Sequence, residues 1–201
     1  MAIATYTELQ ASVLSWMNRP DLSAQVPDFV AIAESRINDD LRVSQMLTAA
    51  ALFTVANMQT VALPTDWLAF KALSVSGEPM QYLPADRIRA QADGGTREPD
   101  SYAIEGGNLL LSQTPDAVYT IDTVYFAKIP SLASAVGGVN WLLTKYPNIY
   151  LYGALVSACQ FTMNDERANY WGGLYASAIE SAIRADRLAT SSGSPLRIRT
   201  R

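Results

Sequence analysis

Histidine is absent from the 201-residue chain, which removes the side chain that most often acts as a general base and binds transition metals. Catalysis by Ser-His-Asp or Cys-His arrangements is therefore excluded. The single cysteine, Cys159, can form neither an internal disulfide nor a cysteine-rich metal site. Its neighbours Val156, Ala158 and Phe161 are apolar, so we interpret it as an inert thiol in a protein core.

Long apolar runs are missing as well. The most apolar segment, residues 149–161, is shorter than the roughly 20 residues of a membrane-spanning helix and contains Gln160. Residues 1–7 lack the basic region and apolar core of a secretory signal. We therefore expect a protein that is made and used in a cytoplasm and has no membrane partner.

Charged residues are scarce, at 17% of the chain, whereas 49% of the residues are hydrophobic. This composition is typical of a well-buried globular protein or of a subunit with large interfaces. The net charge is −4, and because the last five residues hold three arginines and no acid, the rest of the chain carries −7. An acidic body opposes tight binding of nucleic acid, although DNA can still slide past an acidic wall.

Helices are predicted at the beginning of the chain. Thr5 and Glu8 have the spacing of a capping box, and the apolar residues that follow predict a helix over residues 6–18. Pro20 interrupts the pattern, and Pro27 suits the first turn of a second helix. The apolar stripe of this second helix consists of Phe29, Ile32, Ala33, Ile37 and Leu41.

A β-rich region is predicted from about Ala50, with Asn57 at a turn. Further strands are predicted at residues 70–75, 79–83, 101–105, 108–112 and 117–127, and residues 84–92 are compatible with a short helix. Gly106-Gly107 is the clearest hairpin signal, because glycine adopts the positive φ that tight hairpin turns require.

Helical character returns after Gly137-Gly138. Pro147 opens a helix that is apolar nearly all round through Phe161 and must be covered on most sides. Asn164 or Asp165 can cap a last helix that ends near residue 190.

The predicted fold class is α+β. A helical bundle body, residues 1–49 and 138–190, is interrupted by a β-rich, antiparallel insertion over residues 50–137. An extended C-terminal tail, residues 191–201, follows the last helix. The helices on both sides of the insertion must pack together to bury their apolar stripes.

No catalytic, cofactor-binding or metal-binding residue is identified. Gly94-Gly95 and Gly106-Gly107 lack the helix and the Lys-Ser/Thr pair that phosphate-binding loops require. Asp39-Asp40 and Asp165-Glu166 are adjacent carboxylates, whose side chains on a helix point about 100° apart and do not converge on one ligand. We interpret the glycines as turns and the carboxylates as solvated faces or helix caps.

An aromatic group in the C-terminal helices could stack sugars or bases, but almost no basic residues lie between its members, so core and subunit packing is favoured. The main rival function is a β-rich module on a helical support that binds carbohydrate or peptide. A hydrolase that uses carboxylates alone is a weaker alternative, because it needs two acids that converge.

Short segments with no chemical motif recur in a recognisable order along nearly the whole chain. They include Trp16-Met17-Asn18-Arg19, Val26-Pro27-Asp28-Phe29, residues 34–38, Ala62-Leu63-Pro64, Asn140-Trp141-Leu142-Leu143, residues 150–155 and residues 195–199. In their order and spacing the chain resembles the head-to-tail adaptor, or head-completion, proteins of tailed bacteriophages.

The resemblance implies a non-enzymatic structural subunit of the virion neck, without cofactors and assembled in the bacterial host cytoplasm. It implies a ring of identical subunits, expected to be a dodecamer, beneath the portal protein and around the channel through which double-stranded DNA passes without specific binding. Tail or nozzle proteins would bind below the ring. A large contact between subunits would also account for the apolar helix over residues 147–161.

Three groups of residues follow as expected sites. We expect subunit packing by Trp16, Trp141, Tyr150, Tyr152 and Trp171. We expect the tail to dock onto the portal as an added strand through Pro195, Leu196, Arg197, Ile198, Arg199 and Arg201, because apolar and basic residues alternate there. We expect the channel wall to be acidic or neutral, with Asp93, Glu98, Asp100 and Glu105 only partly offset by Arg89 and Arg97.

Overall fold

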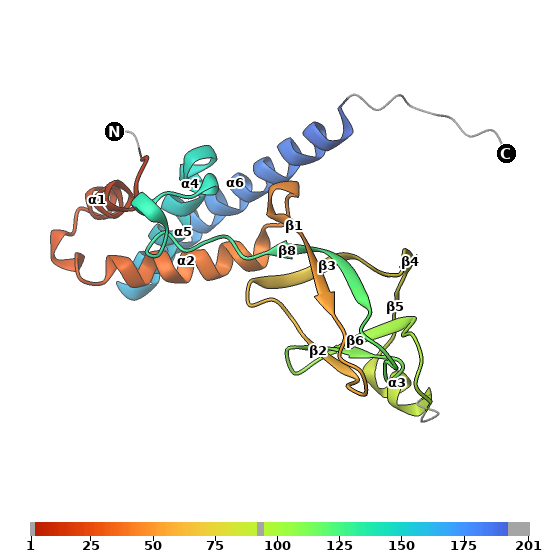
Figure 1. Cartoon of the computed structure of the whole chain (residues 1–201). Coiled ribbons are helices and arrows are strands. Elements are labelled where there is room, and N and C mark those ends of the chain that lie inside the picture. Colours follow the sequence, from red (N-terminus) through yellow and green to blue (C-terminus); the bar gives the residue numbers. More distant parts are fainter. Residues whose placement is uncertain (1–2, 92–94, 193–201) are drawn as a thin grey trace. The chain divides into compact units, whose positions relative to one another are not determined.

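The computed structural model of the chain describes residues 3–91 and 95–192. The chain divides into two units, which we call the helical unit, residues 1–45 and 129–201, and the β unit, residues 46–128. In the described residues, the helical unit contains α-helices and short 3-10 turns but no strand. The β unit contains two sheets and one α-helix in the same described part of the chain (Figure 1). The α+β class predicted from the sequence is confirmed.

The first two helices form as the sequence predicts. Helix α1 (Tyr6–Met17) begins with the capping box, in which Thr5 accepts from the backbone of Glu8 and Glu8 accepts from the backbone of Thr5. Asn18, in the left-handed region at φ 52°, ends it. A 3-10 turn, η1 (Pro20–Leu22), leads to α2 (Val26–Asp40), whose first turn contains Pro27.

Helix α5 (Pro147–Phe161) lies at the centre of the helical unit. It packs against α1, α2, α4 (Trp141–Lys145) and α6 (Asp165–Ser191), so the prediction that it is covered on most sides is confirmed. Ile149, Leu155 and Cys159 are fully buried, and each large apolar side chain buried in this way stabilises the fold by roughly 1.5–3 kcal/mol. The apolar sequence of α5 is therefore explained within the chain, and the explanation through a subunit contact was wrong.

Small residues permit this close packing of α5. A Cβ atom added at Gly153 would lie 3.1 Å from the Cβ of Ala33 on α2 and 3.5 Å from the ring of Tyr175 on α6. Cys159 has its Sγ 3.8 Å from the Sδ of Met17, and burial raises the pKa of its thiol, as expected for an inert core cysteine.

The β unit contains two four-stranded sheets, with strand orders β1-β8-β3-β4 and β2-β7-β6-β5. The first sheet consists of β1 (Leu47–Phe53), β3 (Trp67–Val75), β4 (Glu78–Pro79) and β8 (Thr120–Ala127). The second sheet consists of β2 (Thr60–Ala62), β5 (Gln81–Tyr82), β6 (Ser101–Glu105) and β7 (Asn108–Leu111). The predicted hairpin at Gly106-Gly107 joins β6 to β7, and both glycines have positive φ, at 56° and 78°.

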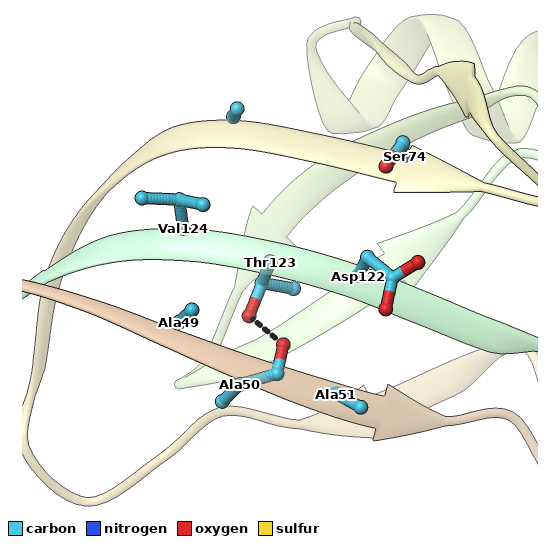
Figure 2. Close-up of a pocket in the computed structure, with 8 residues that line it drawn as sticks. Ala49, Ala50, Ala51, Ser74, Asp122, Thr123 and Val124 are labelled. Atoms are coloured by element: carbon cyan, nitrogen blue, oxygen red, sulfur yellow. Dashed lines mark hydrogen bonds between the residues drawn. The ribbon is translucent and has the colours of Figure 1, made fainter.

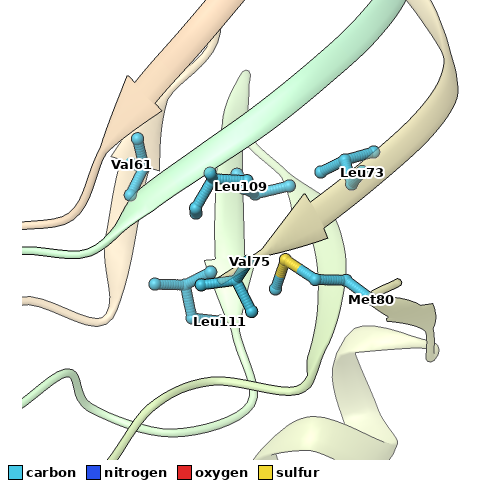
Figure 3. Close-up of a cluster of buried hydrophobic side chains, with 7 residues drawn as sticks. Val61, Leu73, Val75, Met80, Leu109 and Leu111 are labelled. Atoms are coloured by element: carbon cyan, nitrogen blue, oxygen red, sulfur yellow. The ribbon is translucent and has the colours of Figure 1, made fainter. Parts of the chain in front are cut away.

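One core fills the space between the two sheets. It consists of Val61, Leu73, Val75, Met80, Leu109, Leu111 and Ile121 (Figure 3). On the other face of the second sheet, Leu110 and Ala103 pack against Ile88 of α3 (Ala85–Gln91). Because neighbouring residues of a strand point to opposite faces, β7 supplies leucines to both cores.

One strand expected in the insertion was wrong. A single strand over residues 79–83 does not form, because Met80 turns into the core between the sheets and the chain crosses from one sheet to the other at this residue. The backbone of Met80 donates to Leu73 of the first sheet, and that of Gln81 donates to Asp100 beside the second. The resulting β5 pairs with β6 in parallel, whereas the other paired strands of the two sheets are antiparallel, as predicted.

Candidate interaction surfaces

The adjacent acidic pairs Asp39-Asp40 and Asp165-Glu166 are exposed on α2 and α6. Asp165 and Glu166 are exposed in the first turn of α6, which Asn164 caps by accepting from the backbone of Arg167 at 3.2 Å. Asp40 accepts from the Tyr175 hydroxyl at 3.0 Å. Within the described ranges, no group of three or more cysteine, aspartate or glutamate side chains is placed to hold a metal ion.

Four aromatic side chains from three helices meet at the surface of the helical unit. The ring centroids of Trp16 and Tyr152 lie 5.4 Å and 5.8 Å from that of Trp171, and the centroid of Tyr170 lies 5.0 Å from it. Trp171 is 9% exposed, whereas Trp16 is 48% and Tyr170 is 62% exposed. We call Trp16, Tyr152, Tyr170 and Trp171 the aromatic cluster.

The aromatic cluster brings together three of the five residues expected to take part in subunit packing. Tyr150 instead points into the core, where it is 1% exposed and accepts from Asn140, and burial raises its pKa. Trp141 lies half-buried on α4. Tyr170 was not predicted from the sequence, because the periodicity of α6 selects its buried stripe and Tyr170 lies beside that stripe.

A shallow depression of about 340 Å³ lies on the outer face of the first sheet. The register places Ala49 opposite Val124 and Ala51 opposite Asp122, and β3 adds Ala72 and Ser74 on the same face (Figure 2). Thr123 points to the other face and donates to the carbonyl of Ala50 at 2.8 Å (Figure 2). We call Ala49, Ala51, Ala72, Ser74, Asp122 and Val124 the alanine face.

Large apolar side chains gather where the turn after β1 meets the segment before β8. Thr54 is buried and joins the two, because its hydroxyl donates to Ala117 at 3.1 Å and accepts from the backbone of Tyr119 at 2.7 Å. The backbone of Asn57 donates to Pro115 at 2.8 Å. Around these bonds lie four residues that are each more than half exposed, which we call the apolar tip: Phe53, Val55, Met58 and Val118.

Both units match one family over nearly the full chain. The family model described as SU10 adaptor protein matches residues 4–199. The chain belongs to this adaptor family. The family consists of phage head-to-tail adaptors, so the resemblance seen in the sequence is confirmed. No curated protein matches the chain.

The acidic side chains of the adaptor that we expected to line the channel differ in their partners and exposure. Glu105 pairs with Arg89 at 2.7 Å, which offsets its charge. Asp100 accepts from the hydroxyls of Ser112 and Ser101 at 2.9 Å each, and these bonds lower its pKa. Glu98 is exposed, and Asp93 lies outside the described residues.

The portal-docking residues expected in the adaptor tail, Pro195 to Arg199 and Arg201, also lie outside the described residues. None of the helices in residues 3–91 and 95–192 is long and apolar enough to cross a membrane.

Proposed function

We propose that this chain is a non-enzymatic structural subunit of a tailed-phage neck. Identical copies form a ring, expected to be a dodecamer, beneath the portal and around the DNA channel, and link it to tail or nozzle proteins. The observation that carries the proposal is the match to the adaptor family over residues 4–199, which includes both units and most of the tail.

The exposed apolar surfaces support a role in assembly. The helical unit has a complete core of its own, yet it exposes the aromatic cluster, and the β unit exposes the apolar tip and the alanine face. Soluble monomers rarely expose large contiguous apolar patches. Surfaces of this kind are expected on a subunit that buries them against partners.

Lateral contacts of the ring pair the N-terminal helices and the β unit of one copy with the next copy. Trp16, Tyr152 and Trp171 of the aromatic cluster take part in this contact. Trp141 of α4 also takes part, and Tyr150 supports the contact from within the core. Aromatic side chains are enriched at interfaces because they combine a large apolar area with few rotatable bonds.

The tail docks onto the portal, where the alternating residues of the segment 195–199 suit the addition of a strand to an exposed sheet edge. The channel wall is acidic or neutral, which lets double-stranded DNA pass because phosphate binding needs clustered Lys and Arg. The neck location follows from this role, as does assembly in the cytoplasm of the host.

The chemistry of the alanine face disfavours the rival function in carbohydrate binding. The depression is lined mostly by methyl groups, and Ser74 and Asp122 are its polar side chains on that face. A sugar would find few hydrogen-bonding partners there. A shallow, mostly apolar surface of small side chains instead suits close contact with another protein surface.

Electron microscopy of the adaptor mixed with the portal protein of its phage tests the proposal. Closed rings on the portal are expected, and native mass spectrometry of the complex should give multiple adaptor copies. A single adaptor copy for each neck would overturn the proposal.

A further inference from the structure

An acidic groove of about 240 Å³ crosses the surface of the helical unit between the start of α1, the first half of α2 and the segment after residue 130. We call the following residues the acidic groove: Tyr6, Asp28, Val30, Ala31, Glu34 and Ser131. Val30 and Ala31 give the groove part of an apolar lining.

The two carboxylates of the groove differ in how they are held. Glu34 is fixed, since one of its oxygens accepts from the backbone of Leu132 at 2.7 Å, whereas Asp28 is exposed in the first turn of α2. In the part of the chain that the structure describes, neither carboxylate has an ion-pair partner. Burial raises the pKa of Tyr6, and the negative charges of Glu34 and Asp28 raise it further.

Two exposed arginines on α6 are the complement of this groove. Arg184 and Arg187 lie one helical turn apart and line a second hollow with Ile183 and Glu180. Glu180 precedes Arg184 by one turn, yet no ion pair engages Arg184 or Arg187 within residues 3–91 and 95–192. Leu188 beside them is 65% exposed.

We propose that the acidic groove of one copy binds Arg184 and Arg187 of α6 from the next copy. A guanidinium group is planar and donates two parallel hydrogen bonds to a carboxylate, and its aliphatic stem packs on an apolar surface. Arginine therefore fits a groove that is lined both by carboxylates and by the apolar side chains of Val30 and Ala31.

The partner is a second copy and not the same chain. The arginines of one copy form no ion pair with its own Asp28 or Glu34 in the described residues, and α6 packs against α5, whereas the groove is formed by α1, α2 and residues 131–133. A contact between two different surfaces of identical subunits closes into a ring when the rotation between copies allows it. The inference rests on the proposed function and gives one lateral contact of the ring.

Charge reversal tests the contact. Asp28→Lys and the double variant Arg184→Glu/Arg187→Glu should each reduce the fraction of adaptor assembled on the portal by roughly tenfold or more, because each creates a like-charge contact. An equimolar mixture of the two variants should recover assembly, with the two proteins alternating around a ring that has an even number of copies. Native mass spectrometry of the mixed complex should then give equal numbers of both variants.

A matched control keeps the charge change but moves it out of the contact. Asp39→Lys alters an exposed carboxylate at the other end of α2. This variant should assemble as the unchanged protein does. Circular dichroism melts of every variant show whether it is folded, and Asp28→Asn, which removes the charge without reversing it, should weaken assembly in the same direction.

The outcomes separate this contact from the proposed function. Rings that form equally well with both charge-reversed variants would overturn the contact and leave the ring standing. A mixture that fails to recover assembly, although both variants are folded, would also overturn it. An unchanged protein that never forms multi-copy complexes with the portal would overturn the proposed function and this contact together.

Discussion

The side-chain amide of Asn140 donates a hydrogen bond to the hydroxyl of Tyr150 at 2.7 Å, and both residues are buried. The same amide donates to the carbonyl of Pro130 at 2.8 Å, and the Asn140 side-chain oxygen accepts from the backbone of Leu143 at 2.9 Å. One side chain thus joins the segment that returns from the β unit, the start of α4 and the first turn of α5.

Tyr150→Phe should lower the free energy of unfolding of the helical unit by about 1–2 kcal/mol, because it leaves a buried amide hydrogen of Asn140 without an acceptor. Urea unfolding followed by tryptophan fluorescence checks this, since Trp16, Trp141 and Trp171 lie in the helical unit. Tyr152→Phe is the control, and its stability should change by less than about 0.5 kcal/mol. Equal effects of the two substitutions would contradict the role of this hydrogen bond.

The same glycine-to-alanine change should have opposite effects at two positions. Gly107→Ala should destabilise the β6–β7 hairpin by about 1 kcal/mol, because φ is 78° there and alanine is strained in that region. Gly173→Ala should stabilise α6 by about 0.5–1 kcal/mol, because an added methyl group meets no atom within 4 Å and the helix gains propensity. Hydrogen exchange in each element measures the change, and equal signs would refute the explanation.

The adaptor should lose stability in acid partly through Asp100. Hydrogen bonds from Ser112 and Ser101 lower its pKa in the folded state, so its contribution is present above the unfolded value and is lost as pH falls below about 4. Asp100→Asn should therefore make unfolding free energy less dependent on pH below about 4. Glu98→Gln is the exposed control. A steeper dependence in Asp100→Asn would contradict the assigned direction.

The aromatic cluster should contribute more to assembly than to folding. Trp16→Ala removes a side chain that is 48% exposed, so we expect a moderate loss of stability, of roughly 1 kcal/mol, and a large decrease in adaptor bound to portal. Sedimentation of the portal complex measures binding. Phe161→Ala, which changes a comparably exposed aromatic outside the cluster, should bind normally. Normal binding by Trp16→Ala would remove the cluster from the subunit contact.

Deletion of residues 193–201 should leave the fold intact and abolish attachment to the portal. The described core of the helical unit lies between Leu9 and Ala182, so we expect the unfolding free energy to change by less than about 0.5 kcal/mol. Co-sedimentation with portal rings measures attachment, and substitution of Arg197, Arg199 and Arg201 by lysine serves as a variant that keeps the charge. Unchanged attachment of the shortened chain would show that the tail does not dock.

Features that depend on near neighbours in the sequence could be predicted from the sequence. The capping box of Thr5 and Glu8, the covered helix α5 and the turn at Gly106-Gly107 formed as expected. A cap involves residues three apart, a tight turn involves the φ values of two residues, and an apolar helix must be buried somewhere. The surroundings of these residues in the fold do not change those requirements.

Only the tertiary structure decided where residues distant in the sequence meet. Met80 divides an expected strand because its side chain fills the space beside Leu109 and Ile121, which the local pattern of residues 79–83 does not contain. Trp16 reaches Trp171, and Glu34 reaches Leu132, across long stretches of chain. The aromatic cluster, the alanine face and the acidic groove each combine separate elements, so they depend on packing and strand register, which local sequence patterns do not specify.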